Sequence, residues 1–225
     1  MQKVINFLTE LYENNNREWF NDNKATYKEV VEICDNLTEK LITKISGFDK
    51  SVCGLTIKDC SYKIYRDIRF SPDKTPYKTH IGIYICKGGK KSENAGYYLH
   101  IQPKGDFFVN GSLICSGLYM PQGKVLKSVR EEIDFNGKNF IENIKKAKGF
   151  FLFTENKLKK IPKDFSEDSE FLEYIKQKDF LLEQQLSNEV LLKPDLSDYL
   201  AQEFKKTYPF VEQINKAVDF AIQNY

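Results

Sequence analysis

The sequence predicts an α+β fold in which an antiparallel β-meander carries helices from both ends of the chain on one face. Apolar residues recur at helical spacing before residue 46 and after residue 121. Between these regions, apolar and polar residues alternate in short stretches separated by Gly- and Pro-containing turns. Because no low-complexity or Pro/Gly/Ser-rich linker interrupts the chain, we expect residues 1–225 to form a single α+β domain.

The first part of the chain predicts three helices. Residues 3–13 place apolar side chains at helical spacing, and Asn14-Asn15-Asn16 then forms a turn and cap signal. Asn15 stands three residues before Glu18, as in a capping box, which predicts a short helix carrying Trp19 and Phe20. A long apolar stripe predicts a helix over about residues 24–46, with Gly47 at its end.

The middle of the chain predicts the strands. The alternating stretches lie around residues 62–65, 79–86, 96–102 and 107–109, with a further one over 112–115. Their short connections favour hairpins. Lys87–Ser92 resembles a phosphate-binding Walker loop only faintly, because Tyr84 stands where that loop has its first Gly, and we interpret it as a hairpin turn.

The chain from Pro121 onward predicts helices again. The apolar stripes that indicate them lie within 125–133, 140–144, 171–175, 196–204 and 210–218. Charge is uneven here, since residues 138–163 hold eight Lys and two acids, whereas 164–199 hold ten acids and three Lys. These two charged blocks are either a partner surface or two solvated faces that pair with each other.

Composition excludes several classes of protein. With 34 Lys+Arg against 32 Asp+Glu, the net charge of +2 excludes binding of nucleic acid by bulk charge alone. No apolar run approaches the ~18 residues of a membrane span, so we expect a cytoplasmic protein with no membrane partner. Five Cys without a C-x-x-C pair, and only two His, give no basis for a disulfide framework, a metal centre or a cofactor.

The most informative segment is the loop over residues 63–80, which we call the signature loop. It concentrates cationic groups between two predicted strands, namely Arg66, Arg69, Lys74 and Lys78, followed by Tyr77 and His80. Arg forks match the oxygens of phosphate or carboxylate, and Lys adds a point charge. Asp67 and Asp73 either hold the Arg forks at a fixed angle or simply satisfy them.

This loop resembles an uncharacterised, mostly bacterial protein family of about this length, whose signature is approximately R-x-x-R-D-x-R-F-x-x-x-K-x-x-Y. The matching residues are Arg66, Asp67, Arg69, Phe70, Lys74 and Tyr77. Lys63 replaces the first Arg, which keeps the charge but loses the bidentate fork. Residues 7–27, 96–103 and 117–130 are similar to the same family. The resemblance implies a single domain of unknown function and no assigned activity.

Alternation also predicts a polar face beside this loop. His80 and Tyr84 share the side of their strand opposite Ile81, and Tyr98 and His100 share the side opposite Leu99. If the apolar faces of the two strands coincide, these four side chains lie together.

Three functions stay open. The first is binding of a phosphate-bearing ligand, either a nucleotide or a nucleic-acid backbone, by Arg66, Arg69, Lys74, Tyr77, Lys78, Tyr98, Arg17 and Trp19. The second is a phosphoester-type enzyme with His80 or His100 as general base. The third is a protein-interaction module that docks through its charged blocks and in which the signature loop is purely structural. The sequence does not decide the oligomeric state.

Overall fold

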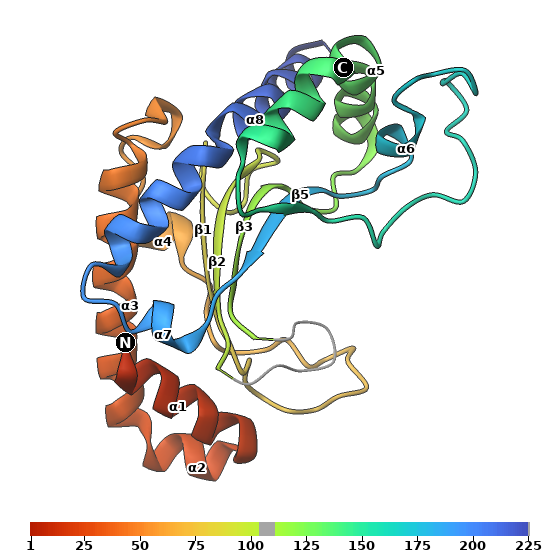
Figure 1. The fold of residues 1–225 in the computed structure, drawn as a ribbon. Coiled ribbons are helices and arrows are strands. Elements are labelled where there is room, and N and C mark those ends of the chain that lie inside the picture. Colours follow the sequence, from red (N-terminus) through yellow and green to blue (C-terminus); the bar gives the residue numbers. More distant parts are fainter. Residues whose placement is uncertain (104–110, 225) are drawn as a thin grey trace.

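A computed structural model of the chain describes residues 1–103 and 111–224 and confirms the α+β class (Figure 1). The helices are α1 (Gln2–Glu13), α2 (Arg17–Asp22), α3 (Lys24–Ile45), α4 (Ile57–Cys60), α5 (Gly123–Lys146), α6 (Leu172–Ile175), α7 (Asn188–Leu191) and α8 (Leu196–Asn224), with a short 3₁₀ helix over Lys50–Val52. The strands are β1 (Ile81–Cys86), β2 (Gly96–Ile101), β3 (Leu113–Leu118), β4 (Phe151–Leu152) and β5 (Phe180–Gln185).

The five strands form one antiparallel sheet in the order β1-β2-β3-β5-β4. The first three are the predicted meander. The hairpin between β1 and β2 turns through Gly88 and Gly89, whose φ values of 77° and 79° are left-handed and therefore suit Gly. The register pairs Tyr84 with Tyr98 and Gly82 with His100.

Helices from both ends of the chain cover one face of this sheet, as Figure 1 shows for α3 and α8. The buried face of β2 meets them through Tyr97, whose ring lies edge-on to Phe204 of α8 with 5.4 Å between centroids. The Tyr97 hydroxyl donates to a carboxylate oxygen of the buried Asp49 at 3.0 Å, so the polar end of this core residue is satisfied.

Two expectations about secondary structure need correction. The stretch around 62–65 is an extended segment attached by isolated bridges, Ser61 to Ile83 and Tyr65 to Tyr77, rather than a regular strand. Strands β4 and β5 lie in a region that the sequence predicts to be helical. In β5, the buried Phe180 and Leu182 alternate with less buried residues, but the strand carries no β-branched residue that would favour an extended conformation. Its pairing with β3 therefore decides its conformation. The strand expected over 107–109 lies outside the described residues.

The N-terminal helices follow the prediction, with one change at the cap. The side chain of Asn16, not of Asn15, accepts a hydrogen bond from the backbone N–H of Trp19 at 2.9 Å and begins α2. The two apolar stripes predicted within 125–144 belong to one helix, α5, which is kinked at Asn136.

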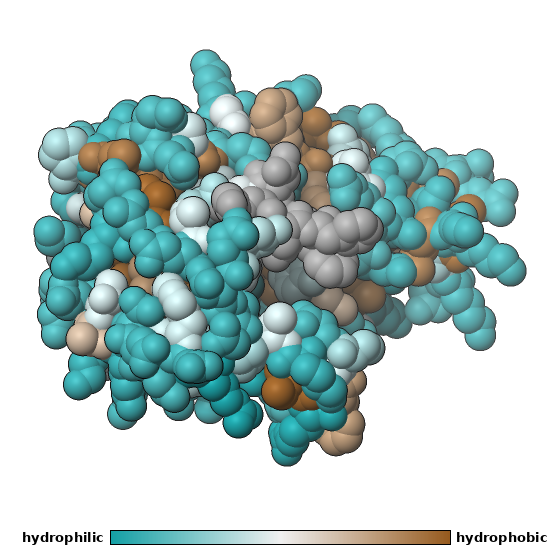
Figure 2. Space-filling view, turned by 90° about the horizontal axis from the view of Figure 1, so that it is seen from below, coloured by the Kyte–Doolittle hydropathy of each residue, from teal (hydrophilic) through white to brown (hydrophobic). Residues whose placement is uncertain are grey.

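The outer surface is mainly hydrophilic on the side seen from below, with separate smaller hydrophobic patches (Figure 2). No helix within residues 1–103 and 111–224 has the length and apolar character needed to cross a membrane.

Candidate functional site

The arginines of the signature loop donate to acids of the same loop. One terminal nitrogen of Arg66 donates to the Asp73 carboxylate and to the hydroxyl of Thr75. The guanidinium of Arg69 donates from Nε and Nη2 to the two carboxylate oxygens of Asp67, at 2.9 and 2.6 Å. This bidentate pairing is the geometry that Arg would otherwise offer to a phosphate.

Asp73 organises this loop. Its carboxylate accepts from the backbone N–H and the hydroxyl of Thr75, each at 2.9 Å. The hydrogen bond from the Thr75 backbone N–H, followed by the one from Arg66, lowers the pKa of Asp73 to about 2. Lys74 donates from Nζ to the carbonyl of Ile68 at 3.0 Å and so also bonds within the loop.

Tyr77 anchors the loop to the N-terminal helices. Its ring is buried and stacks on Phe20 of α2, with 3.9 Å between centroids. The Asn15 side-chain amide donates to the Tyr77 carbonyl at 2.8 Å, and its oxygen accepts from the Tyr77 N–H at 3.1 Å. Asn15 thus pairs with the Tyr77 backbone as a neighbouring strand would.

The remaining predicted ligand residues include Arg17, Trp19 and Lys78. Arg17 is exposed at the first turn of α2, and Trp19 is half-buried with its ring 5.6 Å from that of Phe7. Lys78 lies with its ammonium 5.5 Å from the Tyr62 ring centroid, where burial lowers its pKa. None of these three residues lines the cavity of about 920 Å³ beside the signature loop.

The predicted polar face of the sheet is confirmed by the register of β1 and β2. The rings of His80 and His100 stack, with 4.4 Å between centroids. The Tyr98 hydroxyl lies 3.0 Å from Nδ1 of His100, and Nε2 of His100 lies 2.7 Å from Oε1 of Gln102. Since Gln102 Oε1 only accepts, Nε2 of His100 is the donor of this hydrogen bond.

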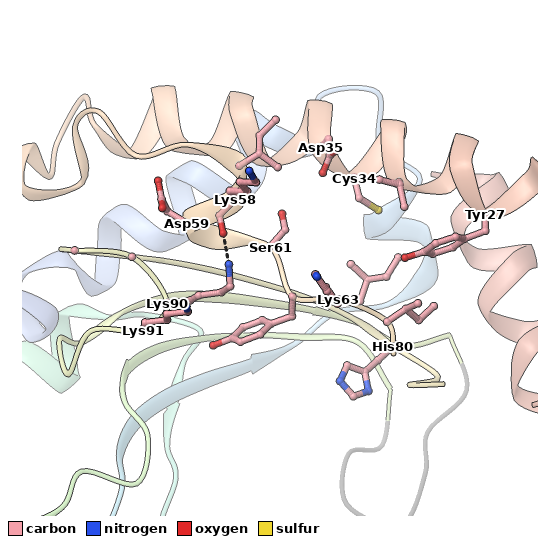
Figure 3. Close-up of a pocket in the computed structure, with 17 residues that line it drawn as sticks. Tyr27, Cys34, Asp35, Lys58, Asp59, Ser61, Lys63, His80, Lys90 and Lys91 are labelled. Atoms are coloured by element: carbon pink, nitrogen blue, oxygen red, sulfur yellow. Dashed lines mark hydrogen bonds between the residues drawn. The ribbon is translucent and has the colours of Figure 1, made fainter. Parts of the chain in front are cut away.

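A cavity of about 920 Å³ opens beside the signature loop, between α3, α4, the 61–64 segment, the start of β1 and the β1–β2 hairpin (Figure 3). We call it the lysine cavity because Lys58, Lys63, Lys90 and Lys91 line it, and the labelled Lys63 and His80 stand at the two ends of the signature loop.

Two acids oppose the four lysines of the cavity, and their environments differ. Asp59 belongs to the capping box of α4, where one carboxylate oxygen accepts from the N–H and the hydroxyl of Thr56 at 2.8 and 2.7 Å. The hydrogen bonds from Thr56 lower the pKa of Asp59. Asp35 of α3 is desolvated, which raises its pKa. Four lysines therefore face two acids at the cavity wall, and the Asp59 carboxylate already accepts hydrogen bonds that cap α4.

The rest of the wall is neutral and largely apolar. Val31, Ile57 and Ile64 line it together with the rings of Tyr27 and Tyr62. Burial raises the pKa of Tyr27 to about 12 and that of the Cys34 thiol to about 12, so both stay uncharged near neutral pH. A molecule in this cavity meets an apolar and aromatic surface beside ammonium groups.

Sequence patterns do not point to Lys58, Lys90 or Lys91, because these residues come from two segments that only the fold brings together. A weak signal existed in Lys87–Ser92. Its backbone does not form a phosphate-binding loop, since the N–H of Gly89 donates to Cys86 and that of Lys90 to Asp59. Its Gly residues instead shape the hairpin that carries Lys90 and Lys91 to the cavity.

Among residues 1–103 and 111–224, no group of three or more His, Cys, Asp and Glu side chains is arranged to hold a metal ion.

Comparison with known proteins gives one finding. No curated protein and no solved structure matches the chain significantly. Residues 3–212 match the family described as "Conserved hypothetical protein (DUF2461)", a domain of unknown function, which confirms the resemblance to an uncharacterised family. The match covers most of the 225 residues, and the chain therefore belongs to this family.

Proposed function

We propose that the protein binds a phosphate-bearing ligand in the lysine cavity. The observation that carries this proposal is the convergence of Lys58, Lys63, Lys90 and Lys91 on one hollow of about 920 Å³. Ammonium groups attract phosphate strongly where the surrounding wall is of low polarity. The volume lies within the range of about 300–1,000 Å³ that is usual for small-molecule sites.

The apolar part of the wall favours a ligand with a ring system. Tyr27 and Tyr62 present aromatic surface in the same hollow as the lysines, so a nucleotide could place its base on a ring and its phosphates at the ammonium groups. A free inorganic phosphate would use only the charged part of the cavity. We therefore expect a nucleotide to bind more tightly than inorganic phosphate.

In this proposal, the signature loop acts as a frame, that is, a rigid segment that holds Lys63 and His80 in place without contacting the ligand through its arginines. Arg66, Arg69 and Lys74 bond within the loop, and Tyr77 fixes it to α2. We assign these residues to positioning Lys63 and His80, which lie at the cavity wall. A ligand that needs the bidentate edge of Arg69, formed by Nε and Nη2, would have to displace Asp67 from it.

The experiment is a thermal shift titration followed by calorimetry, with a panel of nucleotides and inorganic phosphate. Ligands that bind the native state should raise the Tm of the wild-type protein. Lys63→Glu should abolish the increase by reversing a charge in the wall, whereas Lys40→Glu, on an exposed position of α3 away from the cavity lining, should retain it. A panel that leaves the wild-type Tm unchanged would refute the proposal.

A second candidate function is phosphoester chemistry, which one observation favours. His80 lies in the cavity wall and stacks on His100, whose ring is oriented by Tyr98 and Gln102. In this scheme His80 would be the general base and His100 would position it. Turnover of a phosphoester panel should then fall steeply in His80→Asn, and turnover that survives this substitution would reject the role.

A further inference from the structure

A second hollow adjoins the lysine cavity. It has a volume of about 520 Å³ and is lined by Tyr27, Lys28, Val31, Glu32, Lys63 and Tyr65. Three of these residues, Tyr27, Val31 and Lys63, line the lysine cavity as well. We call the two hollows together the lysine groove. A mononucleotide that fills the lysine cavity would leave the second hollow empty.

The cations of the groove come from separate elements and follow one course. Lys90 and Lys91 lie on the hairpin, Lys63 lines both hollows and therefore stands at their junction, and Lys28 of α3 lines only the second hollow. Figure 3 shows Asp35 on the α3 side of the cavity, apart from the side chains of Lys63 and Lys90. This course offers successive ammonium groups to a ligand with several phosphates.

Two partly exposed rings accompany the lysines. Tyr62 lines the lysine cavity and is 40% exposed, and Tyr65 lines the second hollow and is 52% exposed. They stand on either side of Lys63 in the sequence. The Tyr65 ring lies 5.9 Å from that of Phe20 and 5.6 Å from that of Tyr77, so it is already held by buried neighbours.

The Tyr62 ring is flanked by positive charge. The ammonium nitrogens of Lys78 and Lys90 lie 5.5 and 6.0 Å from its centroid, which is within cation–π range. A planar group that stacks on this ring would take the place of one of these ammonium groups, which would then lie beside it. Alternation of exposed rings with cations along a groove is the arrangement by which proteins bind single-stranded nucleic acids without sequence preference.

We infer that the lysine groove binds a short segment of single-stranded nucleic acid, with bases stacked on Tyr62 and Tyr65 and phosphates at Lys28, Lys63 and Lys90. The inference rests on the proposed function and extends it from one phosphate-bearing unit to several. A duplex is excluded as the preferred form because its bases are already stacked on each other and cannot reach the rings. The net charge of +2 gives no bulk attraction that would replace this local recognition.

The experiment compares thymidine monophosphate with thymidylate oligomers up to about eight nucleotides, a length within the site sizes of small single-strand-binding folds. Affinity for the octamer is measured by fluorescence anisotropy at several salt concentrations. We expect affinity to rise with length and to fall with salt, with a slope of about −0.7 per phosphate contacted. Full-length protein is used throughout.

Variants separate the two hollows. Tyr65→Ala should weaken octamer binding by about 5- to 150-fold, the usual effect of losing one stacking ring, and should leave mononucleotide binding unchanged. Tyr65→Phe keeps the ring and should bind as wild type does. Because Tyr65 also contacts buried rings, Lys28→Ala gives an independent test, with Lys40→Ala on the same helix as its matched control. Lys28→Ala should reduce the salt slope by about 0.7.

The outcomes distinguish this inference from the proposed function. The inference about the lysine groove would be refuted by an octamer that binds no more tightly than the mononucleotide. It would also be refuted by an octamer whose affinity is unaffected by both Tyr65→Ala and Lys28→Ala. Neither result would refute ligand binding in the lysine cavity. If a duplex or inorganic polyphosphate binds as tightly as the octamer, the claim that bases stack on Tyr62 and Tyr65 is refuted. Absence of binding by both nucleotide and octamer would overturn the proposed function as well.

Discussion

The signature loop and the lysine cavity are neighbouring clusters of cationic side chains with opposite arrangements. In the loop, each arginine stands within seven residues of an aspartate that accepts from it. In the cavity, lysines from α4, the 61–64 segment and the hairpin line an open hollow, and one of its two acids, Asp59, already caps a helix. The arginines of the loop thus pair with acids close in the sequence, whereas, among the described residues, the cavity lysines have no acid partner of this kind, and Lys90 donates only to the backbone carbonyl of Lys58.

This comparison assigns stability to the loop and binding to the cavity. Substitutions in the two regions should therefore separate the two properties. Loop substitutions that remove packing or hydrogen bonds should lower the free energy of unfolding, and cavity substitutions should not.

Tyr77→Ala should be the most damaging change. It removes a buried ring that stacks on Phe20 and leaves a cavity between the loop and α2. The loss in free energy of unfolding should be about 3–5 kcal/mol, the range for truncating a large buried aromatic residue. Urea denaturation measures it, with Tyr77→Phe as the variant that keeps the ring. Wild-type stability in Tyr77→Ala would show that the loop is not anchored here.

Asn15→Ala should cost less. It leaves the N–H and the carbonyl of Tyr77 without their present partner. An unsatisfied buried polar group costs about 1–3 kcal/mol. The neighbouring Asn14→Ala is the matched control, because the exposed Asn14 side chain donates locally, to the backbone carbonyl of Glu10 in α1. Equal stability of the two variants by urea denaturation would contradict the strand-like role of Asn15.

Asp73 should contribute to stability in a pH-dependent way. Its pKa in the folded protein is about 2, below the usual 3.8, because Thr75 and Arg66 donate to the charged form. The ionised Asp73 carboxylate therefore stabilises the folded state fully above about pH 4. This contribution is lost as the pH falls toward 2 and the carboxylate is protonated. The Tm of the wild type should therefore decline more steeply between pH 4 and pH 2 than that of Asp73→Asn. Parallel declines would argue against the hydrogen-bonded carboxylate.

Lys63→Ala should have the smallest effect on stability. The side chain is exposed at the cavity wall, and surface substitutions of this kind usually change the free energy of unfolding by less than about 0.5 kcal/mol. Urea denaturation tests this expectation. A loss of the size expected for Asn15→Ala would show that Lys63 belongs to the frame rather than to the binding surface.

The sequence predicted the elements whose signal is local. Alternation of Ile81, Ile83 and Ile85 identified β1, and the same alternation placed His80 and His100 on one face, where they stack. It did not predict β5, whose extended form depends on pairing with β3, a partner more than 60 residues earlier in the chain. It also predicted a regular strand around residues 62–65, where the structure has isolated bridges.

The candidate site was predicted only in part, for the same physical reason. Spacing along the chain drew attention to Arg66 and Arg69, but it does not show whether a nearby acid has already taken their donors. Lys58 and Lys90 are far apart in the sequence, and the hydrogen bond from the Lys90 N–H to the Asp59 carbonyl brings their segments together. Sites built from such long-range contacts carry no local pattern that spacing could reveal.

The most direct test of the account compares nucleotide affinity in Lys63→Ala and Arg69→Ala by calorimetry at one salt concentration. Both variants remove a single exposed cation, one from the cavity wall and one from the signature loop. We expect weaker binding in Lys63→Ala and wild-type affinity in Arg69→Ala, since Asp67 already occupies the bidentate edge of that guanidinium. Lost affinity in Arg69→Ala together with unchanged affinity in Lys63→Ala would contradict this expectation.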